Sequence, residues 1–265
     1  MRSLLHKPPD HAAMIMLAVV HFTGDVYSAP AFASQSRKIE DLSLVLLPIT
    51  PGTFQMGSSE GESDEKPVTR VTLTHGFWLG KTEVTQAQWQ AIMGNNPSNF
   101  VGVDRPVEKV LWSEAMEFGR KLTGRERAAG RLPEGYEYTL PTEAQWEYAC
   151  RAGKTGPHAG KVEDMAWYDA NSGRQTQPVA RKQPNAWGLY DMHGNVWEWC
   201  LDWKGSYPGG SVADPRGPSA GTYRVLRGAA WFYGAGDCRS SLRYGNASDR
   251  RFNHVGFRIA LVPSR

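Results

Sequence analysis

The sequence predicts one loop-rich α+β domain, on three observations. The chain has 265 residues, of which 28 are Gly and 17 are Pro, and residues this frequent interrupt long helices. All ten Trp lie between Trp78 and Trp231, and their large rings can anchor irregular segments. Helix-capping signals alternate with short strand-like runs, and no repeat, heptad or low-complexity tract occurs. The economical interpretation is a single compact domain over residues 41–263.

Residues 1–33 are typical of a secretory signal peptide. Arg2 and Lys7 precede an apolar run at 12–20, and small residues follow. The run is too short to span a bilayer. We therefore expect a periplasmic or secreted protein, with a linker at 34–40; a disordered tail is the alternative interpretation. Export would permit disulfides.

Three short helices are predicted from their capping signals, at 85–94, 113–124 and 142–153. Thr85 is followed three residues later by Gln88, which is the pattern of a capping box, and a Gly ends the segment. The second segment begins at a Ser and the third at a Thr, and a Gly ends each of them. Apolar residues share one face of each helix, so that face should pack against the rest of the domain.

The remaining ordered structure should consist of short strands. The candidates lie at 43–47, 68–73, 77–79, 224–227 and 256–261, between clusters of turn residues. Together with the three helices they indicate the α+β class.

The charge balance excludes several partners. Lys and Arg number 30 against 27 Asp and Glu, which gives a formal net charge of +3 without long basic runs. The sequence therefore has no electrostatic footprint for nucleic acid or an anionic membrane. Hydrophobic residues make up 40% of the chain, enough for a real core. We expect a monomer with no membrane span, and we expect the acidic stretch at 60–65 to be a solvated loop.

A series of short motifs in a fixed order carries a resemblance to one family. The motifs lie at 52–58, 81–85, 105–108, 140–148, 185–192, 194–199, 227–228 and 256–258. The strings Leu140-Pro141-Thr142-Glu143-Ala144-Gln145-Trp146 and Gly194-Asn195-Val196-Trp197-Glu198-Trp199 are among them. These segments resemble the formylglycine-generating enzyme, or sulfatase-modifying factor, domain. The resemblance implies a compact variant of the C-type-lectin fold with little regular secondary structure.

The resemblance does not extend to the copper centre of that family. Formylglycine-generating enzymes oxidise a Cys of a sulfatase peptide, using oxygen and a copper ion held by two Cys. Here the corresponding segment, 232–238, contains only Cys238, and a lone Cys cannot supply a two-thiolate site, so copper is not expected. Counting alone leaves the pairing of the three Cys open. The family pattern pairs Cys238 with Cys150 in a disulfide, and Cys200 should pack as a small buried hydrophobe.

The turn from Asp191 to Glu198 is the candidate metal site. The resemblance assigns these two carboxylates, and the carbonyls of Gly194 and Val196, to a calcium ion, which prefers oxygen ligands. The alternative is a hydrogen-bonded turn that holds no metal. His193, within the turn, is expected to face solvent.

Aromatic and short polar residues alternate with framework residues near the C-terminus. Such a mixture resembles a binding surface, because these side chains make adaptable contacts at low entropic cost. It also resembles the diversified tail of lectin-fold proteins that retroelements mutate. The candidate ligand-binding face consists of Trp231, Phe232, Tyr233, Asp237, Leu242, Tyr244, Asn246, Phe252, Asn253 and His254.

Three functions follow from these features. The first is an exported sulfatase-modifying-factor-like protein that lacks the copper-dependent oxidase centre and binds a peptide, glycan or protein partner. The second is a family oxidoreductase that acts on protein thiols and makes formylglycine. The third is a ligand-binding protein whose tail is diversified by a retroelement.

Overall fold

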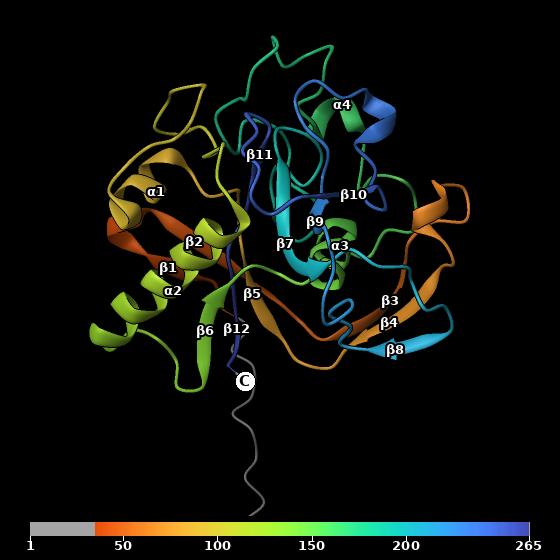
Figure 1. Ribbon diagram of the computed structural model, residues 1–265, viewed down its shortest axis with the longest axis horizontal. Coiled ribbons are helices and arrows are strands. Elements are labelled where there is room, and N and C mark those ends of the chain that lie inside the picture. The colour runs from red at the N-terminus through yellow and green to blue at the C-terminus, as the bar shows by residue number, and fades with distance from the viewer. Residues whose placement is uncertain (1–34, 265) are drawn as a thin grey trace, which may run out of the picture. The chain divides into compact units, whose positions relative to one another are not determined.

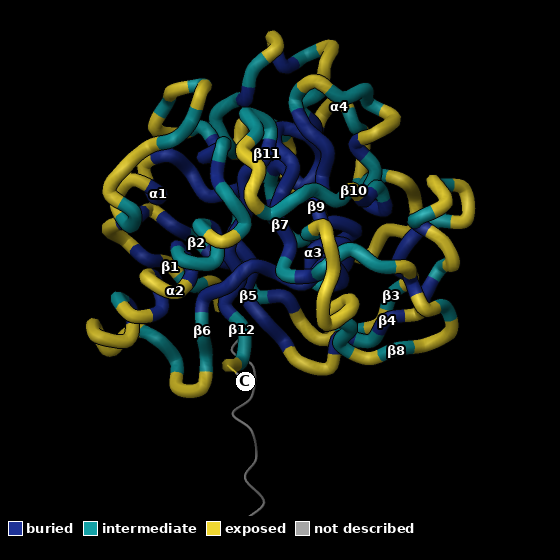
Figure 2. Tube along the Cα trace, in the orientation of Figure 1, coloured by how far each residue is buried: buried dark blue, intermediate teal, exposed yellow. Residues whose placement is uncertain are grey.

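The computed structural model describes residues 35–264, so the signal peptide expected at 1–33 lies outside the described residues. Over that range the chain forms three small sheets and four α-helices (Figure 1). Figure 2 shows buried residues running through the middle of the molecule, with exposed residues on the loops around it. The predicted α+β class is confirmed.

The five-stranded sheet joins segments from both ends of the domain. Its order is β1-β2-β5-β12-β6, and all neighbouring strands are antiparallel. The strands are β1 (Arg37–Ile39), β2 (Leu44–Ile49), β5 (Phe77–Gly80), β12 (Ala260–Pro263) and β6 (Tyr136–Thr139).

Strand β1 corrects the expected linker at 34–40. Arg37 pairs with Leu46 of β2, and Ile39 is buried, so these residues form an edge strand. A three-residue strand has almost no pattern of its own, and its neighbour β2 defines it by pairing.

Two smaller sheets complete the domain. The four-stranded sheet has the order β10-β9-β7-β11, and β11 runs parallel to β7. The three-stranded sheet has the order β3-β4-β8, and β8 runs parallel to β4. The strands are β3 (Gly52–Met56), β4 (Thr69–Leu73), β7 (Trp197–Trp203), β8 (Ser211–Ala213), β9 (Arg224–Arg227), β10 (Arg243–Asn246) and β11 (Val255–Gly256).

Helices α1 and α3 confirm their capping signals, whereas α2 begins one residue before the predicted Ser113 and has Leu111, which has no side-chain cap, at its N-cap. In α1, Gln88 N–H donates to Thr85 Oγ1 at 3.3 Å, and Thr85 N–H donates to Gln88 Oε1 at 3.0 Å. Helix α2 passes the Gly124 at which the sequence predicts its end; a Gly that is not forced into a left-handed conformation only weakens a helix. The helices are α1 (Gln86–Met93), α2 (Trp112–Ala128), α3 (Glu143–Arg151) and α4 (Val162–Met165), with 3-10 turns η1 (Glu40–Leu42), η2 (Ser63–Glu65) and η3 (Ala235–Asp237).

Aromatic rings pack α1 and α2 against each other and against the segment between β11 and β12. Trp89 of α1 stacks on Phe118 of α2 with 5.9 Å between centroids, and Phe257 meets both rings edge-on. A Cβ added to Gly119 of α2 would lie 2.7 Å from the Tyr138 carbonyl oxygen, so α2 packs directly on β6. Among residues 35–264 no helix is both long and apolar enough to cross a membrane.

Candidate functional site

Aromatic side chains near the C-terminus form a connected series of ring contacts. Phe232 lies 4.9 Å from Trp231, 4.6 Å from Tyr233 and 4.8 Å from His254, measured between ring centroids. Phe252 extends the series, at 5.2 Å from His254. Phe232 is 41% exposed, although it touches three other rings. The structure therefore brings together five of the residues that the sequence assigns to a ligand-binding face.

A buried ring connects Tyr244 to this series. Trp197 of β7 lies 5.4 Å from Tyr233 and 6.0 Å from Tyr244. Trp197 is 2% exposed and Tyr244 is 49% exposed, so the buried indole supports the surface phenol from inside. We call the six outer rings, Trp231, Phe232, Tyr233, Tyr244, Phe252 and His254, the aromatic face.

The other predicted face residues mainly stabilise the segments that carry the rings. Asp237 Oδ2 accepts a hydrogen bond from the amide three residues before it, and Asn246 Oδ1 accepts one from the next amide. Leu242 packs against the hydrophobic core. Asn253 lies at the rings, since its carbonyl oxygen accepts a hydrogen bond from Trp231 Nε1 at 3.3 Å.

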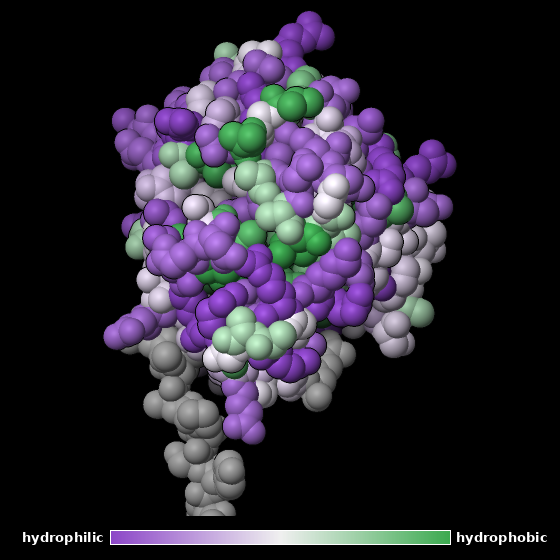
Figure 3. Space-filling view, turned by 90° about the vertical axis from the view of Figure 1, so that its left-hand side faces the viewer, coloured by the Kyte–Doolittle hydropathy of each residue, from purple (hydrophilic) through white to green (hydrophobic). Residues whose placement is uncertain are grey.

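The loop that follows α1 also borders the aromatic face. Phe100 meets Trp231 edge-on at 5.5 Å, and the nearby Val101 and Val103 are 78% and 68% exposed. Sequence reasoning missed this loop, because its apolar residues follow neither a helical nor a strand period. On the side that carries α1 and α2, hydrophobic residues form a broken band among hydrophilic ones (Figure 3).

The face is tied to the candidate metal turn through the backbone. Trp231 N–H donates to the Asn195 carbonyl at 2.9 Å. Glu83 in turn holds that part of the turn, because its carboxylate accepts from Asn195 Nδ2 at 2.7 Å and from Val196 N–H at 3.2 Å. Glu83 lies in the motif at 81–85, but that motif by itself does not show which turn the carboxylate supports.

Glu198, a predicted calcium ligand, is engaged in an ion pair. Arg258 Nε and Nη2 each donate to it at 2.7 Å, and Trp146 Nε1 donates at 2.8 Å. Both Glu198 and Arg258 are fully buried. The carboxylate oxygens of Glu198 therefore accept three hydrogen bonds without a metal.

Asp191, the other predicted carboxylate ligand, has fewer hydrogen bonds than Glu198. Its Oδ2 accepts from the Ala180 amide at 2.8 Å, whereas its buried Oδ1 has no hydrogen-bond partner. Three buried carboxylates, Glu83, Asp191 and Glu198, influence one another here against the single guanidinium of Arg258. Burial and the two neighbouring carboxylates raise the pKa of Glu83 well above its usual value. Burial raises the pKa of Asp191 to about 6.

A calcium ion would fit this turn in part. It would offset the excess negative charge and satisfy Asp191 Oδ1, while Glu198 would have to give up contacts with Arg258 to bind it. Within residues 35–264 no group of three or more His, Cys, Asp or Glu side chains is arranged to hold a metal ion, so carbonyls such as those of Gly194 and Val196 would have to supply most ligands.

His193 is buried, which corrects the expectation that it faces solvent. It is 1% exposed, its Nδ1 lies 2.7 Å from the Cys238 carbonyl oxygen, and its Nε2 accepts from the Ala159 amide at 3.2 Å. Burial lowers the pKa of His193 to about 4. Two hydrogen-bond partners from distant segments hold the neutral ring inside, and neither could be inferred from the turn itself.

The three thiols are buried and free in the structure. Cys150 Sγ lies 3.6 Å from the Met192 carbonyl oxygen and 3.8 Å from His193 Nε2, whereas Cys238 Sγ lies 3.7 Å from the Gly234 carbonyl oxygen. The disulfide between Cys150 and Cys238 is thus not formed here, and it stays a prediction.

The surroundings of these thiols do not favour the thiolate form that a two-thiolate copper site requires. Each Sγ has separate backbone contacts; that of Cys200 lies 4.0 Å from the Glu198 carbonyl. Burial raises the pKa values of Cys150 and Cys238 to about 12, which opposes the thiolate form that copper requires.

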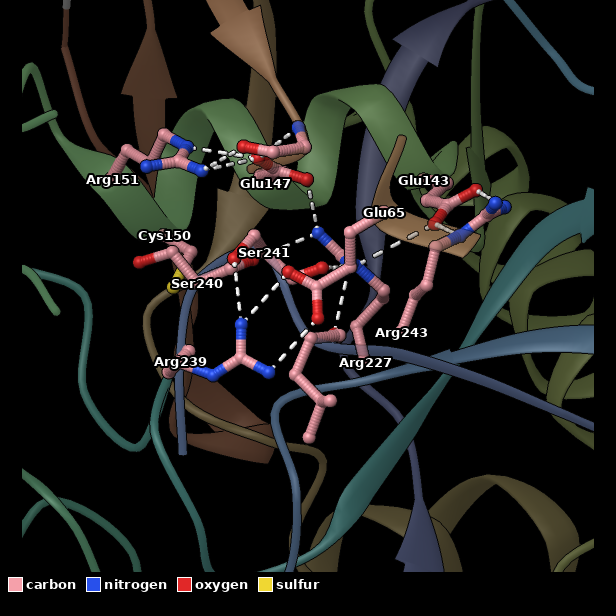
Figure 4. A network of polar contacts seen from close by, with 12 residues as sticks. Glu65, Glu143, Glu147, Cys150, Arg151, Arg227, Arg239, Ser240, Ser241 and Arg243 are labelled. Carbon is pink, nitrogen blue, oxygen red and sulfur yellow. Dashed lines mark hydrogen bonds and ion pairs between the residues drawn. The ribbon is translucent and has the colours of Figure 1, made fainter. Parts of the chain in front are cut away.

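A buried network of charges holds the segment from Arg239 to Arg243, which leads into β10 (Figure 4). Arg227, with zero exposure, donates to the carbonyls of residues 240, 241 and 242 and pairs with Glu147 of α3. Arg243 makes two hydrogen bonds with Glu143, at 2.7 Å and 2.6 Å. The network therefore fixes α3 against the backbone beside the aromatic face.

Glu65 corrects the expectation that the whole stretch at 60–65 is a solvated loop. It is fully buried and accepts two hydrogen bonds from Arg239, at 2.8 Å and 2.9 Å. The partner lies 174 residues further along the chain, so only the tertiary fold reveals it.

The amino-acid sequence is similar to those of proteins in one known family. The sulfatase-modifying factor enzyme 1-like domain matches residues 30–262 of the chain. The chaperone protein LppX of Paenibacillus barcinonensis is 31% identical over 82% of this chain and 87% of its own length. The formylglycine-generating enzyme of Streptomyces coelicolor is 29% identical, over 92% of this chain and 73% of its own.

The fold is also similar to that of a protein whose structure has been solved. Treponema denticola variable protein 1 superposes with a TM-score of 0.78 and 31% identity, covering 85% of this chain and 98% of that one. The family-model match at 30–262 includes the residues that form the turn, the aromatic face and the buried network. The chain therefore belongs to the sulfatase-modifying factor family.

Proposed function

We propose that the protein is an exported binding protein that uses the aromatic face to hold a peptide, glycan or protein partner and does not make formylglycine. The observation that supports this most is the exposure of Phe232 and Tyr244, 41% and 49%; partly buried rings support Phe232, and the buried Trp197 supports Tyr244. Exposed rings on a rigid base bind with little loss of conformational entropy. The signal-like segment at 1–33 supports export.

The cysteines argue against the oxidase activity of the family. Formylglycine formation of the kind that the resemblance implies needs two thiolates on one copper ion. Burial raises the pKa values of Cys150, Cys200 and Cys238, which opposes the thiolate form.

Two measurements test this proposal together. The mature protein, supplied with copper and oxygen, should leave a peptide with the pattern Cys-x-Pro-x-Arg unchanged by mass spectrometry. Conversion of the Cys to formylglycine would overturn the loss of oxidase activity and favour the enzyme alternative.

For binding, the mature protein is screened on displayed heptapeptides and on a glycan array, and the Kd of each ligand found is then measured. Phe232→Ala and Tyr244→Ala should weaken binding about tenfold or more, because exposed rings that are packed on other rings act as anchors. Tyr223→Ala is the matched control, since Tyr223 is also 49% exposed but lies outside the ring series. Equal losses in all three variants would contradict the assignment of the face.

We also propose a calcium ion at the turn, held by Asp191 and the carbonyls of Gly194 and Val196, with Glu198 as a ligand only where it releases Arg258. The free Asp191 Oδ1 and the surplus of buried carboxylates support this. The ion would fix the turn whose Asn195 carbonyl binds Trp231.

A diversified tail is a second candidate, favoured by the likeness to a protein called variable protein 1. A near-identical copy of the coding region for 231–254, next to a reverse-transcriptase gene, would support it. Its absence from the genome would leave the fixed-partner proposal.

A further inference from the structure

A groove of about 930 Å³ runs along strand β3 and contains none of the aromatic-face residues. Three consecutive residues of the strand, Thr53, Phe54 and Gln55, line it. Successive side chains of a strand point to opposite faces of its sheet, so a groove that touches three in a row follows the edge of the strand.

That edge of β3 has no strand beside it among the described residues. In the order β3-β4-β8, shown at the right of Figure 1, β3 pairs on one side with β4 and is the last strand on the other. An outer edge presents a row of backbone N–H and C=O groups that can pair with an added strand. Extended peptides bind other domains in this way.

The groove has an aromatic wall beside the edge. Phe54 lies 5.3 Å from Tyr148 and Tyr148 lies 4.9 Å from Trp187, between ring centroids, and all three line the groove. Tyr148 approaches the strand so closely that a Cβ on Gly52 would lie 2.1 Å from its hydroxyl oxygen. The wall can take an apolar side chain from every second residue of an added strand.

Of the four basic side chains that line the groove, two are paired with acids in the described part of the chain and two are not. Arg151 and Arg239 are bound to Glu147 and Glu65, which neutralises them. Arg70 and Lys154 line the groove as exposed residues.

No hydrogen bond or ion pair within residues 35–264 engages the charged ends of Arg70 and Lys154, and Glu60 is the single acid in the lining. The positive charge that is available to a ligand therefore exceeds the negative charge. An acidic ligand complements it.

We propose that this groove binds an extended acidic peptide segment, which adds to the free edge of β3 with apolar residues against Phe54, Tyr148 and Trp187 and acidic residues toward Arg70 and Lys154. The site is separate from the aromatic face. The two surfaces share no residue, so a ligand can bind one of them without the other. The groove proposal and the proposed function can therefore fail independently.

The test uses the mature protein and a fluorescent peptide, acetyl-Glu-Val-Glu-Phe-Glu-Val-Glu-amide, at low salt. Fluorescence anisotropy should show saturable binding that weakens as salt is added, because exposed charges are screened. Arg70→Glu and Lys154→Glu should each weaken binding at least about fivefold, since reversal turns attraction into repulsion. Lys121→Glu, a reversal at an exposed position on α2, should leave the affinity unchanged.

Three comparison ligands decide the binding mode. The peptide with Lys in place of Glu should not bind. The same acidic peptide with alternate amides N-methylated should bind at least about tenfold more weakly, because it cannot donate to the strand edge. An oligomer of hexuronic acid should not compete.

If the N-methylated peptide binds as tightly as the unmodified peptide, strand addition is wrong. If the hexuronate oligomer binds in the groove and the acidic peptide does not, the groove is an acidic-glycan site and the proposal is overturned. Loss of peptide binding in Phe232→Ala, with Arg70→Glu and Lys154→Glu unaffected, would place the peptide on the aromatic face and overturn the proposal. Thermal unfolding of each variant separates loss of binding from loss of folding.

Discussion

Arg258 donates one hydrogen bond of 2.7 Å to each carboxylate oxygen of Glu198, and neither side chain is exposed to solvent. The pair joins the segment just before β12 to the start of β7. It thereby links the five-stranded sheet to the four-stranded sheet that supports the aromatic face.

Removing one partner of this pair should be strongly destabilising. Arg258→Met leaves the Glu198 carboxylate buried without its cation, and we expect the free energy of unfolding to fall by about 3–5 kcal/mol. Urea denaturation of the purified variant measures the change. The double variant Glu198→Leu/Arg258→Met is the control and should recover much of the loss, because no buried charge is then unpaired. A double variant no more stable than the single one would contradict this account.

Calcium should stabilise the folded protein through Asp191. A ligand that binds only the folded state at a hundred times its Kd raises the free energy of unfolding by about 2.7 kcal/mol. Thermal unfolding with calcium and with a chelator should therefore give different Tm values. Asp191→Asn should abolish the difference, whereas Asp237→Asn, at an exposed acid outside the turn, should keep it. A Tm that is unaffected by the chelator would argue against the site.

Asp202 should make stability depend on pH. Burial, and secondly the nearby Glu143 carboxylate, raise its pKa to about 8 in the folded state. The unfolded state loses this proton near pH 4 and the folded state only near pH 8. The group's contribution to stability is therefore fully present below pH 4 and is lost as the pH rises to 8, by up to about 1.4 kcal/mol per pH unit.

Asp202→Asn keeps an oxygen that can accept from the Glu143 amide, as Asp202 Oδ2 does at 2.9 Å, but removes the titration. Subtracting the variant's pH profile from that of the wild type should leave this downward slope between pH 4 and 8. Parallel profiles would show that Asp202 is ionised in the folded protein.

The pairing of Cys150 with Cys238 remains open to direct measurement. In protein exported to an oxidising compartment, peptide mapping without reduction should find these two residues linked, and the bond should add about 2–5 kcal/mol to stability. Cys200→Ser should leave the linkage intact. An unlinked Cys238 in the oxidised, folded protein would refute the pairing.

Reduced protein provides a second observation on the thiols. Burial raises the pKa values of Cys150 and Cys238 to about 12, so both should resist alkylation at pH 8 until the protein is denatured. Rapid labelling of either thiol in the native protein would mean that the segment around it opens readily.

Features set by local interactions were within reach of the sequence. The helix that begins after Thr85 follows from a capping box only four residues long. The C-terminal rings were recognised because aromatic and short polar residues alternate there with framework residues. The motifs around Trp146 and Trp197 were enough to identify the family and, through it, the fold.

Only the tertiary structure decided which distant residues meet. Glu83 holds Asn195 across 112 positions and Glu65 pairs with Arg239 across 174, and no local pattern encodes such pairs. The burial of His193 depends on the same kind of contact, with the carbonyl of Cys238. Local propensity acts over one or two turns of chain, whereas buried charges and neutral polar groups must find partners wherever the packed fold supplies them. The sequence alone thus determined the family and its short elements, and tertiary packing decided which candidate site residues face solvent and which hold the scaffold.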